Sequence, residues 1–314
     1  MTSKPDLKDI NGLELDRRVW AYDEDRRIAE IALKGRLEGE WEWVEPVKAF
    51  SSGLNDLQLL NQYADREDTD DEDVSQMFDG EELELILEMD EIYSWVRTKS
   101  DCYLGYVHSS YITTRKFEST HSVHALRTFQ MFAPSVKGTH TRYFVFGSQV
   151  KVIGPVENTK WIELEEPLGN VKTYINKSAL EPSTLPPLEW VKQFLGTPYL
   201  WGGRTAWGID CSGLAQMYFR YQNIYIPRDA DQQEAAFAVV TEPRAGDLAF
   251  FDGHVGILLE QNERGNWRML HANSRHMSVT VDTLGEGEYG QYLSSILHGF
   301  GRWEGKIGVY WKPK

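Results

Sequence analysis

Residues 197–204 read Thr-Pro-Tyr-Leu-Trp-Gly-Gly-Arg, and residues 208–214 continue with Gly-Ile-Asp-Cys-Ser-Gly-Leu. The pattern predicts a glycine-rich turn that leads into a helix, because apolar residues recur at helical spacing after Cys211. Cys211 is therefore expected in the first turn of that helix. The unpaired N–H groups of a helix N-terminus favour a thiolate and can lower the pKa of a cysteine to about 3.5–7.5. We accordingly expect Cys211 to be a nucleophile that is ionised at neutral pH.

Two histidines follow where a base and its orienting partner are expected. His254 begins a strand directly after a tight Asp-Gly turn, and His271 lies inside the short apolar run 267–274. A cysteine and two histidines on neighbouring strands supply a nucleophile, a general base and a group that orients the base. The alternatives are a small buried core thiol for Cys211 and a hydrogen-bonded strand histidine for His271.

Residues 198–213 and 253–257 resemble the NlpC/P60 family of papain-like cell-wall peptidases, and Cys211, His254 and His271 match the catalytic triad of that family. The resemblance implies amide hydrolysis through a thioester on Cys211, with no metal or organic cofactor. It also implies that the hydroxyl of Tyr199, twelve residues before the cysteine, lies near the oxyanion. Core packing would explain a tyrosine at this position equally well.

Residues 227–233 resemble the family segment that lines the substrate side of the cleft. In the subgroup that acts on free murein peptides, the aspartate matching Asp229 holds the terminal ammonium of the substrate, and a desolvated ammonium does need an anionic partner. The alternative role of Asp229 is to cap the following helix. Ala230 departs from the subgroup, which has a serine there. The residues expected to contact substrate are Asp229, Arg228, Ser212, Trp201, Tyr93 and Tyr106.

An internal repeat precedes this region. Residues 80–87 match residues 147–154, and residues 105–112 match residues 172–180. Short alternating strands between polar turns predict two small antiparallel barrels, and each unit resembles a bacterial SH3 (SH3b) domain. The barrels would be spacers or cell-wall anchors, or else the first barrel would form one wall of the peptidase cleft. The candidates for a wall-lining tyrosine are Tyr93, Tyr103, Tyr106 and Tyr111.

We therefore predict a multidomain chain with two small all-β SH3b-like barrels followed by an α+β papain-like NlpC/P60 domain. The predicted boundaries are residues 1–45 for an N-terminal extension that packs on the first barrel, residues 46–115 and 116–183 for the two barrels, and residues 184–314 for the peptidase domain. A proline-rich connector near residue 184 separates the barrels from the last domain.

Composition restricts the partners. The 314 residues are 41% hydrophobic and carry a net charge of −15, so we expect neither nucleic acid nor an anionic membrane as a partner. Two cysteines, Cys102 and Cys211, do not make a disulfide framework. The acidic run 65–73 lacks the pattern of an EF-hand and is predicted to be a solvated loop rather than a metal site. The first residues lack signal-peptide features, which predicts a cytoplasmic protein, or a periplasmic or extracellular one if a leader was removed.

The expected function is that of a cysteine endopeptidase, acting as a monomer on the bond between γ-D-glutamate and a diamino acid of murein peptides. The diamino acid is meso-diaminopimelate or lysine, and the favoured substrate is a free peptide with an N-terminal L-alanine, as in cell-wall recycling. One alternative is a hydrolase of intact peptidoglycan that is anchored by its SH3b domains. The other is a non-catalytic protein that binds cell-wall peptides.

Overall fold

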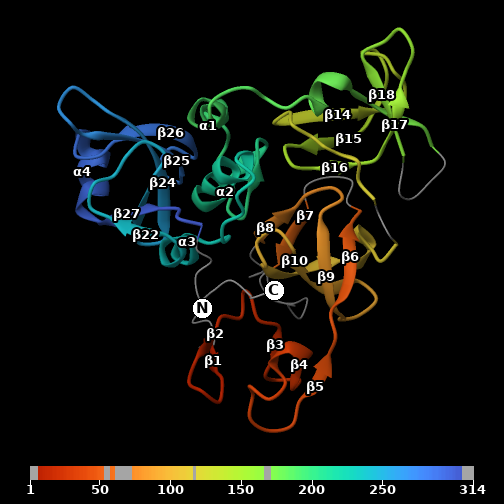
Figure 1. The fold of residues 1–314 in the computed structure, drawn as a ribbon, viewed down its shortest axis with the longest axis horizontal. Coiled ribbons are helices and arrows are strands. Elements are labelled where there is room, and N and C mark those ends of the chain that lie inside the picture. Colours follow the sequence, from red (N-terminus) through yellow and green to blue (C-terminus); the bar gives the residue numbers. More distant parts are fainter. Residues whose placement is uncertain (1–5, 53–56, 61–72, 116–117, 166–170, 306–314) are drawn as a thin grey trace.

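The computed structural model describes residues 6–52, 57–60, 73–115, 118–165 and 171–305 (Figure 1). Strands dominate the described part of the chain, and its α-helices all lie after residue 186. Three sheets of seven, five and six strands carry most of the structure. Of the acidic run 65–73, only Asp73 lies within the described residues.

A small N-terminal segment, residues 6–44, lies below the seven-stranded sheet in Figure 1. It contains β1 (Leu7–Lys8), β2 (Glu14–Leu15), β3 (Tyr22–Asp23), β4 (Ile28–Glu30) and β5 (Glu42–Val44). Its own core includes Leu15, Leu33 and Trp41. Arg97 of the seven-stranded sheet donates to Glu30 at 2.9 Å, and both side chains are buried. The segment is therefore joined to this sheet by a buried ion pair.

The seven-stranded sheet has the order β12-β6-β9-β10-β11-β7-β8. Its strands are β6 (Val47–Ser51), β7 (Leu57–Leu60), β8 (Asp73–Met77), β9 (Glu82–Glu88), β10 (Tyr93–Thr98), β11 (Leu104–His108) and β12 (Ile112–Thr113). Strand β9 alternates glutamate with leucine, and Leu83 and Leu85 are buried while the neighbouring glutamates are less so. This period of two places one face of the sheet on a core.

The five-stranded sheet has the order β15-β14-β19-β18-β17. Its strands are β14 (Arg127–Met131), β15 (His140–Val145), β17 (Val152–Pro155), β18 (Trp161–Leu164) and β19 (Thr173–Asn176), and β13 (His121–Ser122) pairs with β16 (Gln149–Val150) beside it. The two sheets coincide with the two copies of the sequence repeat. Their assignment as SH3b barrels stays a prediction.

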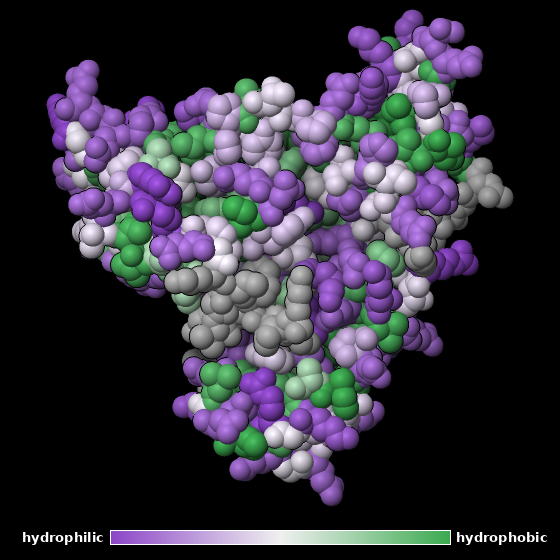
Figure 2. All heavy atoms as spheres, viewed as in Figure 1, coloured by the Kyte–Doolittle hydropathy of each residue, from purple (hydrophilic) through white to green (hydrophobic). Residues whose placement is uncertain are grey.

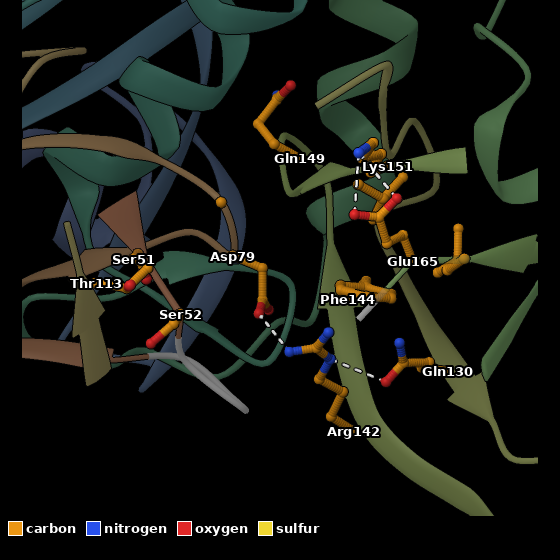
Figure 3. A pocket seen from close by; sticks show the side chains of 13 residues that line it. Ser51, Ser52, Asp79, Thr113, Gln130, Arg142, Phe144, Gln149, Lys151 and Glu165 are labelled. Carbon is orange, nitrogen blue, oxygen red and sulfur yellow. Dashed lines mark hydrogen bonds and ion pairs between the residues drawn. The ribbon is translucent and has the colours of Figure 1, made fainter. Parts of the chain in front are cut away.

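A polar pocket lies between these two sheets (Figure 3). Asp79 and Arg142 face each other across it at 3.3 Å, and Arg142 also donates to Gln130 at 2.9 Å. Within the part of the chain that the structure describes, the buried hydroxyls of Ser51 and Ser52 on the pocket wall have no hydrogen-bond partner. None of the residues that line this pocket is one of the predicted site residues.

The C-terminal region is built on a six-stranded sheet of order β22-β27-β23-β24-β25-β26. Its strands are β22 (Ala238–Val240), β23 (Leu248–Phe251), β24 (His254–Gln261), β25 (Trp267–Asn273), β26 (Ser278–Thr283) and β27 (Leu297–Arg302). The helices are α1 (Pro187–Val191), α2 (Cys211–Tyr221), α3 (Ala230–Ala236) and α4 (Gly287–Ser295), and β20 (Arg204–Thr205) pairs with β21 (Gly208–Ile209). Consecutive residues of β24 pack into two different cores: Ile257 lies in the core that includes α2, and Leu258 lies in the core that includes α4. The sheet is thus covered on both faces.

The hydrophobic core of the C-terminal region also takes in residues at strand ends of the other two sheets, which have cores of their own. Phe78 and Phe146, which directly follow β8 and β15, belong to the same buried cluster as Trp190 and the residues of α2. The ring of Trp190 lies 4.5 Å from that of Phe146 and stacks on Tyr221 at 4.4 Å. Helix α2 consequently lies between the six-stranded sheet and the N-terminal sheets (Figure 1).

The outer surface is mainly polar. Figure 2 shows hydrophilic residues over most of one face, with apolar side chains in separate patches. Among the helices in the described part of the chain, none combines the length and apolar character needed to cross a bilayer.

Candidate active site

Cys211 is the first residue of α2, which confirms its predicted place in the first turn of a helix. Asp210 caps this helix, and its carboxylate accepts from the backbone N–H of Gly213 at 2.7 Å and of Gly202 at 2.9 Å. A Cβ atom at Gly213 would meet the carbonyl oxygen of Gly203 at 2.3 Å. Glycine is therefore required where the turn packs against the start of the helix.

Burial, however, reverses the expected ionisation of this cysteine. The side chain is 6% exposed, and burial raises the pKa of the Cys211 thiol to about 12. The negative charge of Asp210 raises this pKa further, while backbone N–H groups of Val255 and Ser212 oppose the rise. The expectation of a thiolate at neutral pH is therefore wrong for this structure, because desolvation outweighs the helix N-terminus.

The two predicted histidines lie side by side on β24 and β25. Nε2 of His254 is 2.8 Å from Nδ1 of His271, and Nε2 of His271 is 3.0 Å from Oδ2 of Asp282. Thr280 also donates to Asp282 at 2.9 Å. The backbone N–H of Val255, the residue after His254, acts on the sulfur of Cys211, so the thiol lies near the start of the same strand. A line of hydrogen bonds therefore leads from His254 beside the thiol to a carboxylate.

Asp282 was missed by the reading of the sequence. On β26 the residue opposite His271 is Thr280, and Asp282 lies two positions further on the same face. The sequence signal for Asp282 is a carboxylate on the next strand, two residues from the position that faces His271. Recognising it requires the register in which the two strands pair.

Burial also acts on the histidine. It lowers the pKa of His254 to about 3, and the nearby His271 lowers it further. Both His254 and Cys211 are consequently neutral in the ligand-free protein. The site thus contains a protonated thiol and a neutral imidazole, and the imidazole is able to accept a proton.

Tyr199 lies close to the cysteine. Its backbone N–H donates to the carbonyl of Met277 at 2.9 Å, which fixes the residue next to the start of β26. Burial raises the pKa of the Tyr199 hydroxyl, and the neighbouring Cys211 and the carboxylate of Asp210 raise it further. The hydroxyl therefore stays protonated and can donate a hydrogen bond. Trp201, in the glycine turn, is 57% exposed and thus accessible to a ligand.

Arg228 and Ser212 are not available to a substrate, which corrects the prediction for both. Arg228 is 1% exposed and donates to Asp210 at 2.6 Å, to Ser212 at 2.8 Å and to Ser75 at 3.1 Å. The guanidinium thus ties the cap of α2 to the seven-stranded sheet. These two side chains support the start of the helix.

Replacing Arg228 with methionine should destabilise the fold strongly. The substitution leaves Asp210 buried without its cation, a loss that costs about 3–5 kcal/mol in buried ion pairs. Denaturant unfolding measures the change in the free energy of unfolding. The matched control is Arg268→Met, which removes an exposed ion pair with Glu260 and should cost about 0–1 kcal/mol. Equal losses in the two variants would contradict the structural role of Arg228.

Asp229 lies at the N-cap of α3 and contacts a tyrosine of the seven-stranded sheet. This tyrosine is Tyr103, whose hydroxyl donates to Oδ2 of Asp229 at 2.9 Å. The other predicted tyrosines pack elsewhere: Tyr106 stacks on Trp95 next to the N-terminal segment, and Tyr93 packs against His108. Which tyrosine meets Asp229 depends on which loop faces α3, and this is a tertiary contact.

Comparison with known proteins finds that the C-terminal region resembles one family. Residues 196–298 match the sequence model of the NlpC/P60 family. Over 117 residues the chain is 38% identical to the gamma-D-glutamyl-L-lysine dipeptidyl-peptidase of Bacillus subtilis (strain 168), a match that spans 34% of this chain and only 38% of that relative. It is 26% identical over 269 residues to dipeptidyl-peptidase 6 of Lysinibacillus sphaericus, covering 77% of this chain and 96% of the relative.

A solved structure shows that the likeness of fold extends beyond the last domain. An NlpC/P60 family protein from Bacillus cereus superposes with a TM-score of 0.63 at 19% identity, covering 82% of this chain and 99% of the other. At this identity the likeness concerns the fold alone.

Proposed function

We propose that the NlpC/P60 domain in the C-terminal region of this chain is a cysteine endopeptidase that cleaves murein peptides between γ-D-glutamate and a diamino acid. The observation that carries the proposal is the hydrogen-bonded line from His254 through His271 to Asp282, which begins beside the thiol of Cys211. The names of the relatives from Bacillus subtilis and Bacillus cereus, gamma-D-glutamyl-L-lysine dipeptidyl-peptidase, support this bond as the target.

The catalytic cycle begins with a neutral pair. Sγ of Cys211 attacks the γ-carbonyl carbon as His254 takes up the thiol proton, because neither group is charged beforehand. Since Nε2 of His254 is bonded to His271, the other ring nitrogen, Nδ1, receives the proton. His254 then protonates the leaving amine as the C–N bond breaks and the thioester forms. Water attacks the thioester with His254 again as the base, the C–S bond breaks to release the carboxylic acid, and His254 returns the proton to the sulfur of Cys211.

Hydrogen-bond donors around the thiol would stabilise the tetrahedral intermediate. The protonated hydroxyl of Tyr199 is one, and the backbone N–H of Ser212, which acts on the cysteine sulfur, is another. The loss of one such donor typically costs about 2.7–4 kcal/mol of transition-state stabilisation.

Asp229 and Tyr103 suggest the form of the substrate. Both come together where the seven-stranded sheet meets α3, and the side chain of Asp229 is 26% exposed. A partly buried carboxylate is suited to the ammonium of a free peptide N-terminus. The proposed substrate is therefore a free peptide that begins with L-Ala-γ-D-Glu.

The test uses L-Ala-γ-D-Glu-L-Lys and its meso-diaminopimelate counterpart, each with a free and with an acetylated N-terminus, and identifies products by mass spectrometry. Cleavage of the free-amine peptides alone is the expected result. Equal cleavage of both forms would instead indicate a hydrolase of intact cell wall. No cleavage of any peptide would indicate a protein that only binds cell-wall peptides.

Catalysis should also persist into the acid range. His254 has to be neutral to accept a proton, and burial lowers its pKa to about 3, below the usual value of about 6.5. The neutral form therefore remains as the pH falls, and the acid limb of kcat is expected well below pH 6.5. We would measure kcat at saturating substrate, because KM also depends on Asp229. An acid limb close to the ordinary histidine pKa of about 6.5 would mean that burial does not lower the pKa of His254.

A further inference from the structure

A guanidinium from the N-terminal segment reaches the carboxylate to which the proposed function assigns the substrate amine. Nη1 of Arg18 donates to Oδ2 of Asp229 at 2.9 Å. The same side chain is bidentate to Asp231 at 2.9 and 2.8 Å. On its other edge it binds Asp16 through Nε at 3.0 Å and Nη2 at 2.9 Å. One arginine thus bridges three carboxylates from two distant parts of the chain.

The position of Arg18 is fixed from both sides. Its backbone carbonyl accepts from the N–H of Leu104, next to Tyr103, at 2.8 Å. Asp16 is buried and also accepts from Gln232 of α3 at 2.9 Å. The side chain of Arg18 itself is 32% exposed. Arg18 therefore lies where the N-terminal segment, β11 and α3 meet, with solvent on one side.

We propose that Arg18 is a positioning residue for the terminal amine of the substrate. Arg18 and Tyr103 both bond to Oδ2 of Asp229, so together they fix the plane in which this carboxylate is presented. The inference rests on the proposed function, since it is Asp229 that would contact the ligand. Through Arg18 the N-terminal segment takes part in selecting the substrate.

The charge balance at this junction favours a cation. Two guanidinium groups, Arg18 and Arg228, face four carboxylates, so the net charge of this group of side chains is negative. The four carboxylates are Asp16, Asp210, Asp229 and Asp231. A ligand ammonium would reduce this excess, whereas a ligand carboxylate would increase it.

Arg18 also affects the ionisation of Asp229. Burial raises the pKa of this carboxyl and Asp231 raises it further, whereas Arg18, Arg228 and the Tyr103 hydroxyl lower it. If the guanidinium is removed, Asp229 takes up a proton at a higher pH. A variant without Arg18 should therefore lose affinity for the amine most strongly on the acid side.

The experiment compares Arg18→Gln and Arg18→Lys with Arg17→Gln in the full chain. Arg17 is a matched control because it pairs with Asp6 and Glu24, away from Asp229. KM and kcat are measured on L-Ala-γ-D-Glu-L-Lys at acid and neutral pH. In a second measurement, calorimetric titration with L-Ala-γ-D-Glu follows binding to each variant in a Cys211→Ala background.

We expect Arg18→Gln to raise KM and the dissociation constant about 10-fold or more, with kcat within about 3-fold of wild type. The difference should widen as the pH falls, Arg18→Lys should restore part of the affinity, and Arg17→Gln should behave as wild type. Unchanged KM and binding, a fall in kcat alone, or tighter binding after removal of Arg18 would each overturn the inference.

The two proposals fail in different ways. If the wild type binds L-Ala-γ-D-Glu but cleaves no peptide, the peptidase proposal fails and the effect of Arg18 on binding still decides this inference. If the wild type cleaves and Arg18→Gln changes neither KM nor binding, only the inference about Arg18 fails. If the wild type does not bind L-Ala-γ-D-Glu at all, Arg18 has no amine to position and the inference is overturned.

Discussion

Replacing Cys211 with alanine is expected to remove cleavage of L-Ala-γ-D-Glu-L-Lys, with a fall in kcat of about 10⁴-fold or more. The substitution takes away the atom that forms the thioester, and the hydroxyl of Ser212, the next residue of α2, is held in hydrogen bonds with Asp210 and Arg228. Because Cys211 is buried at a helix end, a small side chain should leave the fold intact. Product formation is followed by mass spectrometry, and melting curves check folding.

Cys102 supplies the control. It is the other of the two cysteines in the sequence, and burial raises its pKa to about 11. Cys102→Ala should retain wild-type kcat. If the Cys211→Ala variant cleaved the peptide at a rate comparable to wild type, the thioester mechanism would be wrong.

His271→Ala should lower kcat by about 10²–10⁴-fold while KM changes little, since its partner His254 loses the group that sets its tautomer. In wild type, the fully buried His271 ring connects Nε2 of His254 to Asp282. Without it, the ring of His254 can rotate, and the nitrogen that faces the thiol can carry the proton. Steady-state kinetics on the free-amine peptide measures both constants.

Asp282→Asn is the graded companion of this variant. It keeps the size of the side chain but removes the charge that favours a protonated Nε2 on His271. We expect a smaller fall in kcat than for His271→Ala, with KM again unchanged. Equal activity of His271→Ala and wild type would mean that His254 is oriented by other contacts.

The local parts of the site could be predicted from the sequence. The glycine turn and the start of α2 follow from short-range spacing, and the same reasoning placed His254 at the beginning of a strand. What the sequence did not supply was burial. The expected thiolate at Cys211 follows from the helix N-terminus alone, and burial of the thiol in the folded protein reverses it.

The parts that failed depend on long-range contacts. Tyr103 meets Asp229 only because a turn of the seven-stranded sheet packs against α3. Arg228, the residue before Asp229, instead forms a buried ion pair with Asp210. Arg18, more than two hundred residues away, could not be connected with this site before the chain was folded. The repeat did predict two β-rich units, whereas their classification as SH3b barrels remains a prediction.

The shared aromatic core has a consequence for unfolding. Phe78 and Phe146 bury the same cluster that holds Trp190 and α2, and Arg220 of α2 lies over the ring of Phe78 at 4.3 Å. Excision of the C-terminal region would expose this apolar surface to water, at about 25 cal/mol for each Å². We expect the sheets to melt as one cooperative unit, with calorimetric and van't Hoff enthalpies that agree. A destabilising change in an N-terminal sheet would then lower the fraction of folded catalytic centres, although it lies far from Cys211.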